Sequence, residues 1–438
     1  MLQKRFQTLL LLGFVKILYV SQYFPPEMGA PSARAAELAQ HWANTGHAVS
    51  ILTGFPNHPT GVVPAEWQGR LRRLAFHEKV GMVNVYRTWL WPLPNRKAHE
   101  RMRNYASFAI SSALRGMSLS RPDVIIATSP QLLVGLAGWW LAFARRIPFV
   151  FEVRDLWPES LPAVGMGDEN SVLHRSLSAV SNFLYRHSDH IVVVAPAFKE
   201  YLIQRRQVPA EKISVVENGV ETDLFSPGAP GANSSLRHEL GANGKFLVCY
   251  VGTMGMAHGL ETLLDAAAQL QKENVDVRFL LIGEGAVKER IKALAQTRGL
   301  ANVRFLDQQP HDKIPAFISA SDACLVLLRK TEIFKTVIPT KMLEFMSCGR
   351  PVILGVDGQA RKIVEEAEAG IVIEPENSAA LVAAIQRLAA DPNLGQKLGR
   401  QGREYIVRKL SRHQTADDYI QVLDGVRARA RQLNVRAA

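Results

Sequence analysis

Short runs rich in valine, isoleucine and leucine alternate along the chain with longer stretches of helical periodicity. Such runs predict buried parallel strands joined by crossover helices. In the first half we expect strands at residues 16–20, 48–53, 83–86, 123–127, 149–153 and 190–194, and helices at 32–45, 101–117, 131–144 and 173–187. The pattern restarts with strands at 246–251, 277–282, 303–306, 323–328, 351–354 and 371–373, then helices at 378–391 and from 394 onward.

This order predicts an α/β protein with two doubly wound, Rossmann-like domains that face a cleft. Residues 226–244 between the halves are rich in proline and glycine, as a loop or hinge is. We therefore expect a first domain at 1–225, a second at 226–400, and a helical extension at 401–438 that packs back on the first domain. Open α/β sheets bind ligands at the carboxyl ends of their strands, so the cleft is where function is expected.

Composition excludes several classes of protein. Of the 438 residues, 47% are hydrophobic and 21% charged, and no stretch is of low complexity, which disfavours disorder, collagen and coiled coil. The apolar stretch at 6–15 is shorter than the roughly twenty residues that cross a membrane, and no signal-peptide cleavage site follows it. The three cysteines share no metal-ligand spacing and fit a reducing cytoplasm.

The net charge of +12 is concentrated in one segment. Residues 70–121 carry eleven basic and two acidic residues, a balance of +9, interleaved with Trp89, Trp91, Tyr105 and Phe108. This mixture is expected where a protein meets anionic lipid headgroups, and a solvated basic face is the alternative. Nucleic acid is not an expected partner, because no DNA- or RNA-binding motif accompanies the charge.

Glycine-containing loops follow three of the expected strands. The loop after the first strand holds only Gly29, whereas a dinucleotide fingerprint needs three glycines, so it suits the wall of an acceptor site or a rigid connection. After residue 251, the backbone amides around Gly252, Thr253 and Gly255 can face an anion. The third loop, Gly283-Glu284-Gly285, offers a close approach to a ring or a ribose, or is a plain turn.

Cationic residues collect between residues 325 and 352. The strand there ends at Arg329, the loop adds Lys335, and a proline followed by Thr340 begins a short helix. Lys341 and Glu344 are three residues apart and share one face of that helix, giving a cation for phosphate and a carboxylate for two sugar hydroxyls. A surface ion pair on a packing helix is the alternative.

Together these segments resemble the GT-B glycosyltransferases of family 4, which are retaining enzymes that use nucleotide sugars. The resemblance spans nearly the whole chain and is carried by the Gly29 loop, residues 218–225, the two later glycine loops and residues 341–351. Runs 152–158 and 334–339 are similar to those of bacterial amino-sugar transferases in O-antigen or capsule assembly.

The resemblance implies a reaction and a set of roles. A sugar, expected to be an N-acetylated amino sugar, would pass from a UDP-sugar to a polyprenyl-diphosphate-linked saccharide, in the cytoplasm at the inner membrane surface. No Asp-x-Asp pair occurs in the chain, so we expect neither a metal nor another cofactor. The expected catalytic residues are Asp155, Arg329, Lys335 and Glu344. The expected donor-binding residues are Gly252, Thr253, Gly255, Gly283, Glu284, Gly285, Arg329, Lys335, Thr340, Lys341 and Glu344, and the acceptor-binding residues are Gly29, Arg154 and Asp155.

The chain departs from the family pattern at four positions. Thr336 stands where the family usually has the first of two glutamates, and Thr253 and His258 stand where an arginine and a lysine usually clamp the diphosphate. Arg154 precedes Asp155 where many relatives carry histidine. Two other functions stay open: a UDP-sugar epimerase of the same fold, and a non-enzymatic binder of nucleotides or nucleic acid.

Overall fold

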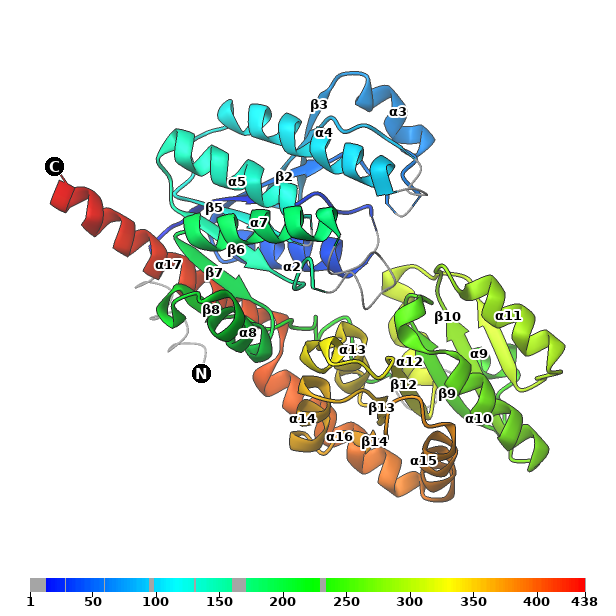
Figure 1. The fold of residues 1–438 in the computed structure, drawn as a ribbon. Helices are drawn as coiled ribbons and strands as arrows, with labels where there is room; N and C mark the ends of the chain where they lie inside the picture. The colour runs from blue at the N-terminus through cyan, green and yellow to red at the C-terminus, as the bar shows by residue number, and fades with distance from the viewer. Residues whose placement is uncertain are drawn as a thin grey trace. The chain divides into compact units, whose positions relative to one another are not determined.

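The computed structural model describes residues 13–27, 29–58, 60–93, 98–129, 131–159, 171–228 and 234–437. They form two compact units (Figure 1). The first unit runs to Glu217 and takes up the C-terminal segment from His413, and the second runs from Asn218 to Arg412. Among the described residues, no helix has both the length and the apolar character needed to cross a bilayer. The apolar stretch expected at 6–15 lies mostly outside the described residues.

In the first unit, eight strands of the described chain form one sheet in the order β3-β4-β2-β1-β5-β6-β7-β8. Neighbouring strands are parallel except β3 and β4. The strands are β1 (Lys16–Val20), β2 (Ala48–Gly54), β3 (Ala75–Val80), β4 (Val83–Thr88), β5 (Val124–Thr128), β6 (Phe149–Val153), β7 (His190–Val193) and β8 (Ile213–Val215). The sequence missed β3 and β8, because β3 has no buried residue and β8 is only three residues long.

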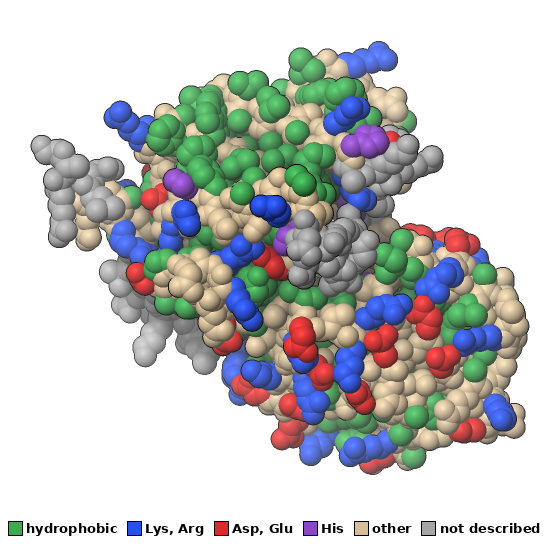
Figure 2. Space-filling model, viewed as in Figure 1, with side chains coloured by type: hydrophobic (Ala, Val, Ile, Leu, Met, Phe, Trp, Pro, Cys, Tyr) green, Lys and Arg blue, Asp and Glu red, His purple; other side chains and the backbone are tan. Residues whose placement is uncertain are grey.

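Helices cover both faces of this sheet. They are α2 (Ala30–Asn44), α3 (Ala65–Leu71), α4 (Ala98–Met117), α5 (Leu132–Arg145), α7 (Val172–His187), α8 (Pro196–Arg206) and α17 (Arg412–Ala437), with the 3₁₀ turn η1 (Ala210–Lys212). Trp42 of α2 and Tyr419 of α17 pack in one core with Ile126 of β5. Its strand neighbour Ala127 faces the other way, against Gly138 of α5. Figure 2 shows hydrophobic side chains gathered over the α4, α5 and α7 layer.

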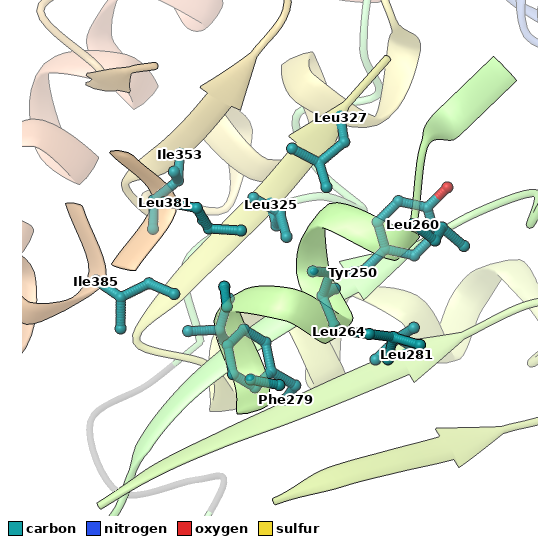
Figure 3. Close-up of a cluster of buried hydrophobic side chains, with 14 of the residues drawn as sticks. Tyr250, Leu260, Leu264, Phe279, Leu281, Leu325, Leu327, Ile353, Leu381 and Ile385 are labelled. Atoms are coloured by element: carbon teal, nitrogen blue, oxygen red, sulfur yellow. The ribbon is translucent and has the colours of Figure 1, made fainter. Parts of the chain in front are cut away.

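The second unit holds a six-stranded parallel sheet in the order β11-β10-β9-β12-β13-β14, again among the described residues. Its strands are β9 (Phe246–Val251), β10 (Val277–Ile282), β11 (Val303–Leu306), β12 (Ala323–Leu327), β13 (Val352–Gly355) and β14 (Gly370–Val372). Figure 3 shows its core, in which Leu264 of α10 (Glu261–Lys272) packs in one cluster with Phe279 of β10 and Leu325 of β12. Every strand expected here is confirmed to within one residue, because buried parallel strands are continuous apolar runs.

The helices of this unit are α9 (Ser234–Glu239), α10 (Glu261–Lys272), α11 (Lys288–Thr297), α12 (Ile314–Ala320), α13 (Thr340–Ser347), α14 (Gln359–Glu366), α15 (Ser378–Ala390) and α16 (Pro392–Lys409). The 3₁₀ turns are η2 (Met256–His258), η3 (His311–Lys313) and η4 (Ile333–Thr336).

The unit boundaries differ from the expected breaks at 225 and 400. Val220 forms a β-bridge with Ser411, and Ser347 donates a hydrogen bond of 2.6 Å to the Phe225 carbonyl. The chain enters the second unit at Asn218 and leaves it after Arg412, and these contacts hold both of those segments in the second unit. The hinge-like composition at 226–244 marks a segment of that unit, and part of it is helix α9.

Candidate donor and acceptor sites

The switch point of the second sheet lies at β9. The chain proceeds from β9 to β10 and β11 on one side, and later places β12 on the other. Open α/β sheets bind ligands at the carboxyl ends of the strands that flank such a point. Gly252 directly follows β9, and Arg329 follows β12 after one residue. These two strand ends define the candidate donor site.

The two glycine loops of the second unit hold each other in place. The Gly252 amide donates to the Ile282 carbonyl at 2.9 Å, and the Met254 amide donates to the Glu284 carbonyl at 2.8 Å. A Cβ at Gly283, whose φ is +144°, would lie 2.1 Å from the Gly252 carbonyl oxygen. No side chain fits at that distance, so glycine is required for the loops to meet.

The side chain of Glu284 is already engaged. Its carboxylate lies 2.6 Å from Nζ of the buried Lys288, which also contacts Asp307 at 2.6 Å. This arrangement ties the start of α11 to the end of β11. Thr253, in the neighbouring loop, is exposed, and its carbonyl accepts a hydrogen bond of 2.7 Å from the Tyr250 hydroxyl.

Lys341 lies against the Gly252 turn. It is the second residue of α13, whose first residue is Thr340, and its Nζ donates to the Tyr250 hydroxyl at 3.0 Å. The ammonium also lies 4.1 Å from the centre of the Tyr250 ring, and 3.1 Å from where a Cβ at Gly252 would be. Desolvation lowers the pKa of Lys341 to about 7, against the raising effect of Glu344. An anion bound at this helix N-terminus would favour the charged form of the lysine.

His258 takes one of the positions where the family has a diphosphate clamp. Its Nδ1 lies 3.3 Å from the Gly255 amide nitrogen, and its ring packs edge-on to Tyr250. Desolvation and the charge of Lys341 lower the pKa of His258 to about 3. The imidazole is therefore neutral at physiological pH and adds no positive charge to the site.

The other expected cations occupy separate places. Arg329 donates from Nε to the Met256 carbonyl at 2.7 Å, with Glu376 and Glu261 at 3.5 and 3.7 Å. Lys335 is exposed on η4, with its Nζ 2.6 Å from Glu332. Of the three expected cations, the structure thus places Lys341 directly on the Gly252 turn.

Glu344 has a neighbour that sequence reasoning missed. Its carboxylate, with the side chain 19% exposed, lies 4.0 Å from Nε2 of His311 on η3. The His311 ring stands edge-on to Phe225 at 5.1 Å. No motif surrounds His311, so the sequence carried no signal for it. Thr336, in place of the first family glutamate, donates its hydroxyl to the Ile333 carbonyl at 2.7 Å.

In the first unit, the expected acceptor residues lie at the carboxyl ends of β1 and β6. Gly29 caps α2 with a φ of +122°. The Arg154 amide donates to Ser129 Oγ at 2.7 Å, and its Nε and Nη1 are buried without a hydrogen-bond partner among the described residues. Asp155, the next residue, is exposed to solvent.

A buried ion pair supports Arg154. Glu152, fully buried on β6, lies 2.9 Å from Arg34 of α2 and accepts a hydrogen bond of 2.6 Å from the Tyr19 hydroxyl. Burial opposes the charge of Glu152, but Arg34 and Arg154 outweigh burial and leave its pKa lowered. The network holds the end of β6, and with it Arg154, in one position.

A second buried carboxylate was also missed. Glu27, in the loop after β1, accepts hydrogen bonds from the Asn57 and His58 amides at 2.8 and 2.9 Å. Burial raises its pKa to about 7, and these bonds lower it only in part. Glu27 therefore joins the loops that follow the carboxyl ends of β1 and β2.

Comparison with known proteins names the family. The family model "Glycosyl transferase 4-like domain" matches residues 29–219, and "Glycosyl transferases group 1" matches residues 234–405. The two matches cover most of both compact units. The chain is a glycosyltransferase with a glycosyl transferase 4-like domain and a group 1 domain. Its activity is glycosyl transfer. Both family models describe glycosyl transferases, and neither describes an epimerase or a non-enzymatic binder.

Individual relatives agree with this assignment. The putative colanic acid biosynthesis glycosyl transferase WcaI of Escherichia coli K12 is 25% identical over 94% of this chain and 100% of that protein. Among solved structures, sucrose-phosphate synthase from Thermosynechococcus elongatus is 22% identical, with a TM-score of 0.73 over 94% of this chain and 99% of that one. Anabaena Alr3699/HepE, solved with UDP-glucose, is 20% identical, with a TM-score of 0.70 over 94% and 100%. The predicted α/β class with two Rossmann-like domains, the GT-B fold, is confirmed.

Proposed function

We propose that this glycosyltransferase moves a sugar from a UDP-sugar to a polyprenyl-diphosphate-linked saccharide, with retention of anomeric configuration and without a metal or other cofactor. The observation that carries the proposal is Lys341, held on the Gly252 turn at the N-terminus of α13. Transfer from a nucleotide sugar needs charge stabilisation on the departing diphosphate. A lysine and the free amides of a helix start provide it without a metal ion.

The donor would extend from this turn along α13. Glu344 lies one turn after Lys341 on the same helix face and would bind the ribose hydroxyls, with His311 beside its carboxylate. Arg329, at the end of β12, would contribute a second positive charge to the leaving group. The UDP and UDP-glucose complexes of the structural relative HepE support a uridine nucleotide as the donor.

The acceptor would bind the first unit. Two buried nitrogens of Arg154 have no hydrogen-bond partner among the described residues and suit an anionic group such as an acceptor diphosphate, since an unsatisfied buried donor is costly. Asp155 would orient the attacking hydroxyl, and Gly29 would leave room for the acceptor beside α2. The colanic acid relative supports a role in polysaccharide assembly. We expect that role to be in surface polysaccharide such as O antigen or capsule, at the cytoplasmic side of the inner membrane. The resemblance to amino-sugar transferases favours an N-acetylated amino sugar.

The test is transfer by the purified protein in the presence of EDTA. UDP-glucose, UDP-N-acetylglucosamine and UDP-N-acetylgalactosamine are each offered with a short polyprenyl-diphosphate monosaccharide, and products are read by mass spectrometry. Nuclear magnetic resonance then assigns the anomeric configuration. We expect the acceptor to gain one N-acetylhexosamine in the α configuration of the donor. No transfer from any UDP-sugar, or transfer only with added divalent metal, would contradict the proposal.

Variants tie the activity to the site. Lys341→Ala and Glu344→Ala should each lower kcat at least about a hundredfold, the usual cost of losing a group that stabilises charge in the transition state. Glu365→Ala is the matched control, because this exposed carboxylate on α14 pairs with Arg361. Near-normal rates in the Lys341 and Glu344 variants would remove both residues from the site.

A further inference from the structure

Five large hydrophobic side chains are exposed on two helices of the first unit. Along α4, Ile110, Leu114 and Met117 are 64%, 66% and 43% exposed, and on α5 Trp140 and Phe143 are 39% and 71% exposed. The α4 residues are spaced by four and three positions and so share one face of the helix. We call these five residues the apolar ridge.

The two helices that carry the ridge pack closely against each other. A Cβ at Gly116 of α4 would lie 2.5 Å from the Leu141 side chain of α5. The Arg145 guanidinium also donates to the Gly116 carbonyl at 2.7 Å and to the Leu119 carbonyl at 2.9 Å. Hydrophobic side chains dominate this layer in Figure 2, whereas the visible face of the second unit mixes both charges. A contiguous exposed apolar surface marks an interaction site.

The charge around the ridge is predominantly positive. Helices α4, α5 and α7 together contain six arginines and one acidic residue, Glu100. Near the start of α4, the Arg103 guanidinium lies 6.0 Å from the ring centre of the exposed Trp91. Beyond its end, the exposed Arg121 donates to the Arg146 carbonyl at 3.0 Å. An apolar centre with a cationic and aromatic rim is complementary to an anionic lipid surface.

The structure also changes which residues of the basic segment can make such a contact. Phe108, which the sequence placed on this surface, is fully buried. Arg87 is buried as well and pairs with Glu78 at 2.6 Å. Trp91 stays exposed, and its amide is held by the Ser107 hydroxyl of α4 at 2.8 Å. The exposed apolar surface is thus the α4 and α5 ridge, with Trp91 beside its first turns.

We propose that the apolar ridge and its arginine rim dock on an anionic lipid bilayer, with α4 and α5 lying along the headgroup region. The inference rests on the proposed function only in that a lipid-linked acceptor gives the docking a purpose. The binding itself needs neither donor nor acceptor, so it is measured separately from transfer.

The test is co-sedimentation of the full chain with vesicles of phosphatidylethanolamine and phosphatidylglycerol, and with phosphatidylcholine vesicles as the uncharged comparison. We expect binding to the anionic vesicles that weakens with added salt. The double variant Leu114→Asp/Phe143→Asp should bind them at least about tenfold more weakly, because two apolar contacts become two repelled charges. Met82→Asp is the matched control: Met82 is 64% exposed, in a turn whose Gly81 lies against Gln40 of α2, and should leave binding unchanged.

Three results would overturn the inference. They are an absence of anionic vesicle binding by the unmodified chain, equal binding by the ridge variant and the control, or a dimer in sedimentation velocity that the ridge variant converts to monomer. The ridge variant should keep its thermal unfolding temperature and its activity on a water-soluble short-chain acceptor. If vesicle binding depends on the ridge but no UDP-sugar is ever transferred, the proposed function fails and this inference stands.

Discussion

Binding of the donor should be coupled to proton uptake through Lys341. Desolvation lowers the pKa of this lysine to about 7 in the free protein. A diphosphate placed against Nζ favours the protonated form and raises that pKa. The protein therefore takes up a proton when it binds the donor at a pH above 7, and the donor binds more weakly as the pH rises.

The size of the effect follows from the pKa. With a value of about 7, the charged fraction of Lys341 falls from about nine-tenths at pH 6 to about one-tenth at pH 8. The apparent dissociation constant should then rise about tenfold over this interval, or about 1.4 kcal/mol. His258 does not contribute, because its pKa of about 3 keeps it neutral throughout.

The assay is isothermal titration calorimetry with a UDP-sugar, whose diphosphate diester has no proton to lose in this range. Repeating it at pH 8 in buffers of different ionisation enthalpy counts the protons taken up, which should approach one. Lys341→Arg should bind without pH dependence, since arginine stays charged. Lys341→Met should bind weakly at every pH, and His311→Gln should keep the unmodified dependence. A pH-independent affinity in the unmodified protein would refute the reasoning.

Four further predictions concern stability and the donor site. Gly283→Ala should lower the free energy of unfolding by about 3 kcal/mol in urea titrations, because its Cβ would meet the Gly252 carbonyl at 2.1 Å. Glu152→Gln should cost about 3–5 kcal/mol by leaving Arg34 buried without its counter-charge, and an unchanged midpoint would show the pair to be dispensable. In the unmodified protein, the pKa of Glu152 is lower than in the unfolded chain. The ionised Glu152 therefore contributes to the free energy of unfolding above about pH 4.3, and this contribution is lost as the pH falls through the folded-state pKa. Measuring the unfolding midpoint as a function of acid pH tests this. Glu344→Gln should weaken UDP binding in the same calorimeter, and unchanged affinity would place the ribose elsewhere.

The local sequence pattern was sufficient to predict the buried strands and the glycine turns of the second unit. A parallel strand buried on both faces must be a continuous apolar run, so β9 and β10 could be located to the residue. Strand β3 could not, because its residues are only partly buried and carry no such pattern. Lys341 and Glu344 could be placed on one helix face, since their spacing alone fixes that.

Contacts between segments far apart in the sequence could not be predicted from the pattern of hydrophobic and polar residues. Arg34 and Glu152 are separated by 118 positions, and no motif around either residue indicates that they form an ion pair. The same is true of Glu27, which is bound by amides thirty residues away in the loop after β2. Each of these carboxylates owes its pKa to atoms that only the folded chain brings near.

The sequence by itself determined the two-sheet class, the strands of the second unit and the helix that carries Lys341, because each depends on residues close together along the chain. The tertiary structure decided which charges are paired, how far the pKa of Lys341 falls, and which apolar stripes face solvent. Ile110 and Leu114 have the spacing of core residues on an amphipathic helix. In the structure both are exposed, because burial is set by what lies across from a helix face and not by the residues on it.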